Sequence, residues 1–211
     1  MSKVKVFTLI GCLVLLIGTV GACKTRSQTG FFELHPRILI HESNLGSGKN
    51  LKVSVVDKRR RNILLRKESD RKIKSGRALV TKDYHPSVKL DFNFQKTAQE
   101  AFQMQGYQTD GKGTGSFREV TIYITKLDLR VRRDRKNSVD QSMFQARLRS
   151  KMKISARNQG RTYNKEYEFF IKKSYDVIPG KEDNEKILNY GLTQLLYQIM
   201  DDPKLTRFLT G

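Results

Sequence analysis

The residue with the most definite chemistry in this sequence is Cys23, which follows a basic, then an apolar, then a small-residue stretch. Lys3 and Lys5 precede an apolar run from Val6 to Ile17, and residues 18–22 read Gly-Thr-Val-Gly-Ala. A charged region, an apolar region and a small-residue cleavage region, in this order, are typical of a secretory signal peptide. The sequence therefore predicts an exported chain whose mature form begins with a thiol.

The last four residues of this stretch, Val20-Gly21-Ala22-Cys23, resemble the lipobox of bacterial lipoproteins. The resemblance implies that the Cys23 thiol receives a diacylglyceryl group, that the chain is cut before it, and that the new terminus receives a third acyl chain. Two acyl chains already anchor a protein stably, so three hold it almost permanently. Lys24 stands where an aspartate would retain the protein in the inner membrane. The resemblance thus implies an outer-membrane anchor, with the domain facing the periplasm of a two-membrane cell.

Two alternatives exist for this segment. An uncleaved transmembrane helix is disfavoured, because Val6 to Ala22 is only about 17 residues, the lower limit for crossing ~30 Å of hydrocarbon. Leu9-Ile10-Gly11-Cys12 matches the same pattern, but the apolar run continues past it. We therefore interpret Cys12 as part of the signal peptide and Cys23 as the lipid attachment site.

A second set of chemically active residues is a stripe of cations within residues 143–157. Apolar residues hold the even positions of this segment, whereas Arg147, Arg149, Lys151, Lys153 and Arg157 hold odd positions. Because side chains alternate across a strand, the pattern predicts one core face and one basic face. These five residues are candidates for binding anionic lipid, lipopolysaccharide or acidic glycan. A solvated basic face without a dedicated ligand is the alternative.

The whole chain is strongly basic, with 41 Lys and Arg against 21 Asp and Glu. Removal of Lys3 and Lys5 with the signal peptide lowers the formal charge from +20 to +18. Such a charge in a cytosolic protein would favour nucleic acid, but export and the lack of aromatic residues among the basic patches argue against a nucleic-acid partner. The mature chain keeps only Cys23, so an internal disulfide is excluded and a packed core must hold the fold.

No catalytic or metal-binding constellation is recognisable in the sequence. His35, His41 and His85 lack the spacing of a metal site. Gly46-Ser47-Gly48-Lys49 lacks the first glycine and the final Ser or Thr of a phosphate-binding loop. Asp57 ends a predicted strand, where an acid more often caps a turn or pairs with a nearby arginine. We predict no enzymatic activity, metal or cofactor, and keep a motif-free cleft joining Asp57 and His85 as the enzyme alternative.

Hydrophobic periodicity predicts the elements that position these residues. Leu51–Val56 alternates as a strand, residues 88–105 form an amphipathic helix, and residues 183–200 form a second, longer one. Residues 120–131 form a strand whose apolar phase changes near Thr125 or Lys126, which predicts a β-bulge. A short helix follows Asp202-Pro203.

Residues 143–157 pair with the segment after Asn158-Gln159-Gly160-Arg161 in a hairpin. A loop of Gln159 and Gly160 sets Met152 opposite Tyr167 on the core face and Lys153 opposite Glu166 on the outer face. Agreement of both faces on one register supports the pairing. The predicted fold is α+β: an antiparallel sheet of about four strands with two main helices on one face, in the order β-α-β-β-β-α.

Several of these segments resemble the YajG-like family of bacterial outer-membrane lipoproteins. The resemblance rests on Val53-Ser-Val-Val-Asp57-Lys-Arg59, on Met104-Gln-Gly106-Tyr107, on the strand from Val120 to Leu129 and on the hairpin from Ala146 to Tyr167. It implies the α+β fold and the envelope location, but no defined activity.

The organisation that follows is a signal peptide (1–22), a tether (23–30) and one basic domain (31–211). Within that domain, residues 58–77 are rich in cations and poor in apolar patterning, and we interpret them as an exposed basic excursion. We expect a non-enzymatic structural or assembly role in the envelope, with envelope proteins or an anionic envelope surface as partners. The alternative is a binding protein for anionic lipid, lipopolysaccharide or glycan; the sequence leaves the oligomeric state open.

Overall fold

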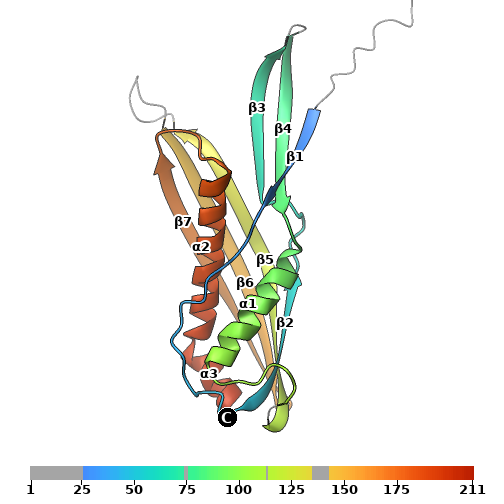
Figure 1. Ribbon diagram of the computed structural model, residues 1–211, viewed down its shortest axis with the longest axis vertical. Coiled ribbons are helices and arrows are strands. Elements are labelled where there is room, and N and C mark those ends of the chain that lie inside the picture. The colour runs from blue at the N-terminus through green and yellow to red at the C-terminus, as the bar shows by residue number, and fades with distance from the viewer. Residues whose placement is uncertain (1–25, 74–75, 113, 135–142) are drawn as a thin grey trace, which may run out of the picture.

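The computed structural model describes residues 26–73, 76–112, 114–134 and 143–211, which form two sheets and three helices (Figure 1). The fold class is α+β, as predicted. The strands are β1 (Arg26–Phe32), β2 (Lys49–Asp57), β3 (Leu65–Ile73), β4 (Gly76–Pro86), β5 (Thr114–Asp134), β6 (Met143–Asn158) and β7 (Arg161–Tyr175). The helices are α1 (Leu90–Met104), α2 (Lys181–Met200) and α3 (Pro203–Thr210).

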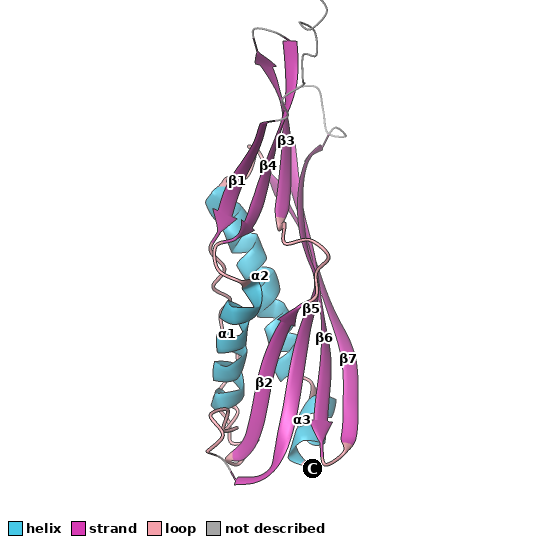
Figure 2. Ribbon diagram, turned by 90° about the vertical axis from the view of Figure 1, so that its right-hand side faces the viewer, coloured by secondary structure: helices cyan, strands magenta, loops and turns pink. Residues whose placement is uncertain are grey.

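The larger sheet has the strand order β2-β5-β6-β7, and the helices pack on one of its faces (Figure 2). Its chain order, β2-α1-β5-β6-β7-α2, is the predicted one. The prediction of an all-antiparallel sheet is wrong for one pair, since β2 and β5 run parallel. The reason is that α1 returns the chain to the end where β2 began, as a crossover helix does.

The β6–β7 hairpin has the predicted register. Met152 is paired with Tyr167, and Lys153 with Glu166. The two loop residues, Gln159 and Gly160, have φ values of 49° and 78°. Positive φ at both positions matches the right-handed twist of the two strands, and this explains why a two-residue loop fixes the register here.

The predicted bulge in β5 is also present, between Ile124 and Lys126. Ile122 and Ile124 point into the core before it, and Leu127 and Leu129 do so after it, all at most 3% exposed. The bulge therefore changes which face each residue of β5 occupies without removing apolar side chains from the core.

Apolar stripes of α1 and α2 fill the space under the sheet. Phe94 and Phe102 of α1 and Leu192 and Ile199 of α2 are all fully buried. Helix α2 approaches the sheet most closely at Gly191, where an added Cβ would lie only 2.3 Å from Leu148 Cδ2. A side chain at this position would push the helix away from β6.

The second sheet, in the order β1-β4-β3, overturns the interpretation of two segments. Residues 58–77 are not simply an exposed excursion, because β3 and the start of β4 pair within this region. The predicted tether is too long, because β1 begins at Arg26 and pairs parallel with β4. Residues 66–72 are all polar, so no hydrophobic alternation marks the strand; main-chain pairing in a sheet that extends beyond the helices forms it instead (Figures 1 and 2).

The chain after β1 is fastened along α2 by main-chain hydrogen bonds to side chains of the helix. The amides of Glu33, His35 and Arg37 donate to Glu185, Asn189 and Thr193 at 2.7, 2.6 and 2.8 Å. Every second residue of an extended segment thus meets every fourth residue of the helix. This contact requires the residue spacing of the extended segment to match that of the helix, although the two segments lie far apart in the sequence.

Candidate anion-binding surface

The five cations predicted on residues 143–157 all lie on the outer face of the larger sheet. Arg147, Arg149, Lys153 and Arg157 are exposed and Lys151 is half-buried. They occupy one long strand, whose rise of about 3.4 Å per residue separates the first from the last by roughly 34 Å. The five residues therefore share a face but do not form one compact site.

Acidic residues accompany the half of this stripe that lies toward the β6–β7 turn. Lys151 Nζ lies 2.9 Å from Glu168 Oε2 and 3.3 Å from Glu166 Oε1. These hydrogen bonds, first to Glu168 and then to Glu166, raise the pKa of Lys151. Lys153 and Arg157 form no ion pair in the described structure, but they lie opposite Glu166 and Glu119 in the strand register. Three acids therefore accompany the cations of this half.

The other half gathers further cations from both neighbouring strands. Arg147 is paired with Arg130 of β5 and with Lys172 of β7. We call the set that surrounds Arg147 the basic face; it consists of Arg130, Arg132, Arg147, Arg149 and Lys172. Within the described residues, only Arg130 in this set forms an ion pair, at 2.9 Å to Asp128, which also lies opposite Arg149 in the strand register.

Aromatic rings lie beside cations on this side of the sheet, contrary to the expectation that none would. The guanidinium carbon of Arg149 lies 5.6 Å from the ring centre of Phe170, whose side chain is 50% exposed. Lys58 Nζ lies 4.2 Å from the ring centre of Tyr123. The rings come from neighbouring strands, so a search along one segment misses them. They hold cations in place on the surface and add an apolar contact for a ligand.

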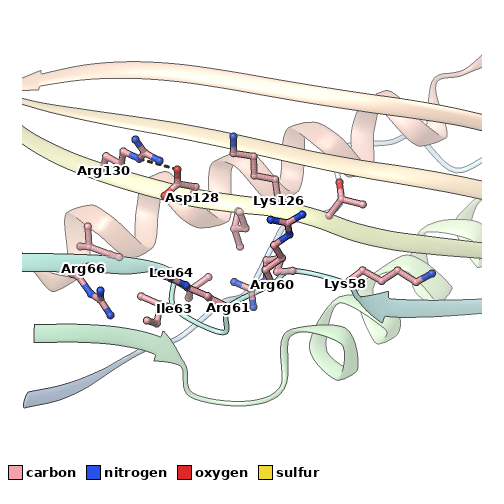
Figure 3. A pocket seen from close by; sticks show the side chains of 13 residues that line it. Lys58, Arg60, Arg61, Ile63, Leu64, Arg66, Lys126, Asp128 and Arg130 are labelled. Carbon is pink, nitrogen blue, oxygen red and sulfur yellow. Dashed lines mark hydrogen bonds and ion pairs between the residues drawn. The ribbon is translucent and has the colours of Figure 1, made fainter. Parts of the chain in front are cut away.

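A basic cavity of about 540 Å³ lies where β2 leaves the larger sheet (Figure 3). Two main-chain bonds to β5 bound it: Lys58 N donates to the Ile124 carbonyl at 2.9 Å, and Leu129 N donates to the Leu64 carbonyl at 3.1 Å. Between these bonds the chain bows away from β5. Its cationic lining residues are Lys58, Arg59, Arg60, Arg61, Arg66, Lys126 and Arg130.

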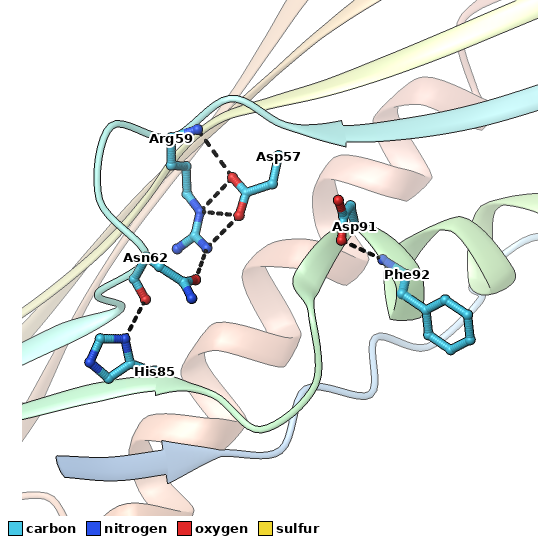
Figure 4. A network of polar contacts seen from close by, with 6 residues as sticks. All are labelled: Asp57, Arg59, Asn62, His85, Asp91 and Phe92. Atoms are coloured by element: carbon cyan, nitrogen blue, oxygen red, sulfur yellow. Dashed lines mark hydrogen bonds and ion pairs between the residues drawn. The ribbon is translucent and has the colours of Figure 1, made fainter.

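One wall of this cavity is fixed by a polar network around Asp57 (Figure 4). Arg59 donates from Nε to Asp57 Oδ1 at 2.9 Å and from Nη2 to Oδ2 at 2.7 Å, as a bidentate pair. Arg59 Nη2 also donates to Asn62 Oδ1, and the Asn62 carbonyl lies 3.0 Å from His85 Nδ1. Asp57 thus orders the start of the loop, as its position at a strand end suggests.

This network does not place Asp57 and His85 in contact, because Arg59 and Asn62 lie between them (Figure 4). Both carboxylate oxygens of Asp57 are engaged by one guanidinium. Across the described ranges, no three His, Cys, Asp or Glu side chains gather in a way that could hold a metal ion. The charged side chains around this cavity are instead mostly cations, some of them held in ion pairs.

Cys23, the predicted lipid attachment site, lies outside the described residues, as does the segment before it. In the part of the chain that the structure describes, no helix has both the length and the apolar character needed to span a bilayer.

Comparison with solved structures finds the same fold in a crystal structure of an uncharacterized protein. The TM-score is 0.50 at 14% identity, covering 84% of this chain and 97% of the other. A protein from Xanthomonas campestris gives a TM-score of 0.42 at 11% identity, covering 86% of this chain and 96% of that one. A minor lipoprotein from Acinetobacter baumannii gives 0.34 at 12% identity, covering 77% and 91% of the two chains. A search of curated proteins gives no match.

Comparison with family models is more specific. The model described as "Uncharacterized lipoprotein" matches residues 36–210, which run from within the segment along α2 to the end of α3. The match confirms the resemblance drawn from the sequence. The chain therefore belongs to this family of YajG-like lipoproteins.

Proposed function

We propose that this lipoprotein is a non-enzymatic component of the cell envelope that binds anionic groups of the envelope on its basic face. In this proposal acylated Cys23 holds it in the outer membrane, and the domain faces the periplasm. The observation that carries the proposal is the row of Arg130, Arg147 and Lys172 on three adjacent strands. Neighbouring strands are about 4.8 Å apart, so the row offers closely spaced donors to phosphate or carboxylate oxygens.

The short connection to the anchor supports a partner at the membrane. Only Lys24 and Thr25 separate Cys23 from the first residue of β1. Three extended residues span at most about 10 Å, so the β1-β4-β3 sheet would stand close to the bilayer. Anionic head groups attract nearby cations with about 1 kcal/mol for each Lys or Arg.

The test uses the full acylated protein reconstituted in phosphatidylcholine nanodiscs that are immobilised on a sensor surface. Vesicles containing phosphatidylglycerol or lipopolysaccharide are passed over it, and the retained amount is measured. Replacement of Arg147, Arg149 and Lys172 by glutamine removes three cations and should weaken retention by roughly 100-fold, at about 1 kcal/mol each. Unchanged retention by this variant would contradict the proposal.

A structural or assembly role is the second candidate, and exposed apolar residues favour it. Val177 and Ile178, in the connection between β7 and α2, are 73% and 58% exposed. Adjacent exposed apolar side chains suit a contact with another envelope protein. Crosslinking in intact cells should then capture a partner with the native protein and lose it when both residues are replaced by serine. Recovery of the monomer alone from native cells would argue against this role.

A further inference from the structure

We propose that the cavity beside β5 is a separate binding site for a phosphate ester that carries an apolar substituent. This goes beyond the basic face, which supplies only Arg130 to its lining. The cavity occupies a break in the sheet: β2 ends at Asp57, opposite Ile124, and the chain next bonds to β5 at Leu129. No strand of the described chain is paired with β5 on this side between those two points.

The walls carry cations that the protein leaves without acidic partners. Lys58, Arg60, Arg61 and Lys126 form no ion pair with any acid among the described residues, whereas Arg66 is held by Asp83 at 2.7 Å. Arg60 and Arg61 come from the loop after β2, and Lys126 comes from the bulge of β5 (Figure 3). Cations from two separate elements can therefore contact the same anion. Guanidinium groups match the oxygen geometry of phosphate particularly well.

Arg59 provides an independent indication of a ligand. Its side chain is only 4% exposed, and it lines the cavity while bound to Asp57. Its Nη1 is buried and has no hydrogen-bond partner in the described structure. A buried donor left unsatisfied is unfavourable, and a ligand oxygen placed next to it would remove that cost.

The floor of the cavity determines the rest of the ligand. Leu64, Leu65 and Leu127 underlie it but are at most 3% exposed, so the apolar side-chain surface that a ligand can contact comes mainly from half-buried Ile63 beside them. A volume of about 540 Å³ lies in the range of small-molecule sites, roughly 300–1,000 Å³, and exceeds what a phosphate ion alone would fill. Cations above an apolar floor fit a phosphate group joined to a short hydrocarbon or acyl part.

The source of such a ligand is either a lipid or a water-soluble phosphate ester. Dihexanoyl phosphatidic acid and glycerol 3-phosphate represent the two sources. Each is titrated by calorimetry into the full acylated protein held in phosphatidylcholine vesicles. Stronger binding of the phosphatidic acid supports a lipid source, and equal binding overturns the assignment of an apolar substituent. Equal competition by zwitterionic dihexanoyl phosphatidylcholine at the same concentration would overturn the assignment of a ligand with net negative charge.

Matched variants separate this site from the basic face. The change R60Q/R61Q/K126Q should weaken binding of the phosphatidic acid by at least about tenfold, since hydrogen bonds to charged groups are lost. The change R147Q/R149Q/K172Q removes binding at the basic face but no cation that lines the cavity, so the preference for the phosphatidic acid over glycerol 3-phosphate should persist in this variant. Ile63→Ser should weaken the phosphatidic acid but not glycerol 3-phosphate.

Unfolding temperatures of all variants establish that each is folded before binding is compared. Loss of that preference in the basic-face variant, or no loss of binding in the cavity variant, would overturn the inference. The second of these results would leave the proposed function of the basic face standing, so the two failures are distinguishable.

Discussion

Arg130 and Arg147 occupy directly paired positions on the adjacent strands β5 and β6. Like charges that face each other across a sheet are destabilising, and Lys172 adds a third cation on the next strand. Near the middle of β6, Lys151 also lies opposite a cation, Lys126, but it has two glutamate partners. An anion bound at the basic face would reduce this repulsion. In the other half of the strand, the glutamates beside Lys151 already do so.

The repulsion itself can be measured through stability. Arg147→Gln in the ligand-free protein should raise the free energy of unfolding by about 0.2–1 kcal/mol, because it removes a cation from between two others. Chemical denaturation in low salt measures the difference. Lys153→Gln serves as the control; it removes a cation opposite Glu166, so it should not stabilise the protein. A destabilised Arg147→Gln variant would show that the row is not under strain.

The second prediction concerns Asp202, which is 3% exposed and caps α3. Its carboxylate accepts hydrogen bonds from Tyr163 at 2.8 Å, Lys165 at 3.0 Å and the Lys204 amide at 3.0 Å, and also from Tyr167. Burial acts to raise the pKa of Asp202, but these bonds outweigh it and hold the pKa below its ordinary value.

Because the pKa of Asp202 is lower in the folded state, the unfolded chain binds a proton first as the pH falls. The stabilisation is therefore complete above about pH 5 and is lost progressively below about pH 4. Asp202→Asn should lower the free energy of unfolding by about 2–3 kcal/mol at neutral pH. It should also make the further loss of stability below about pH 4 smaller. Asp201→Asn, at the exposed neighbouring position, is the control and should lose stability at low pH as the native protein does. Thermal unfolding between pH 3 and 7 measures this difference, and equal pH dependence of the two variants would contradict the prediction.

Ionisation of Tyr163 should make the folding stability fall at alkaline pH. Burial first, and then the hydrogen bond to Asp202, raise the pKa of Tyr163 to about 12. A folded-state pKa above that of the unfolded chain contributes stability below about pH 10, and this contribution is lost as the pH rises toward the folded value. Tyr163→Phe should reduce the loss of stability measured between pH 9 and 11. An unchanged slope would mean that the phenol does not hold its proton more tightly in the folded protein.

The close approach of α2 to β6 makes a prediction about packing. Gly191→Ala places a methyl group where an added Cβ would lie 2.3 Å from Leu148 Cδ2, and Leu148 is itself fully buried. Overpacking of this kind costs about 1–3 kcal/mol. Denaturation of the variant measures the cost, and the combined Gly191→Ala/Leu148→Ala variant should lose less stability than the sum of the two single changes. A neutral Gly191→Ala change would mean that helix and strand are not in such close contact.

The lipid anchor is tested by two cysteine variants that differ only in position. Cys23→Ala should abolish acylation and release the protein from the membrane fraction, whereas Cys12→Ala should alter neither. Mass spectrometry of the mature N-terminus and cell fractionation measure these effects. Membrane retention of the Cys23→Ala protein at wild-type levels would remove the basis for a membrane-anchored function.

Much of the larger sheet could be predicted from the sequence because each element carries its own signal. The loop Gln159-Gly160 fixes the hairpin register, and that register also pairs Arg147 with Lys172 and Arg149 with Phe170. Part of the basic face was therefore contained in the predicted pairing, although the alternation along residues 143–157 alone did not reveal it. Arg130 could not be found in this way, since no short turn sets the register between β5 and β6.

The smaller sheet and the cavity could not be predicted. The sequence of β3 is almost entirely polar, so its strand depends on pairing with β4 rather than on burial of one face. The pairing of β1 with β4 joins residues more than fifty positions apart in the sequence. The cavity depends on the first of these features, because its walls are set by the end of β2, the start of β3 and the bulge of β5.

The central claim is that one half of the β6 stripe binds anions and the other does not. Its most direct test compares R147Q/R149Q/K172Q with K151Q/K153Q/R157Q, which remove the same charge from the same sheet face, in the capture of phosphatidylglycerol vesicles by the full acylated protein. The account predicts that the first variant loses roughly 100-fold in retention, at about 1 kcal/mol per cation, and that the second loses less than about tenfold. Equal losses in the two variants would contradict it, because they would show that only total charge matters.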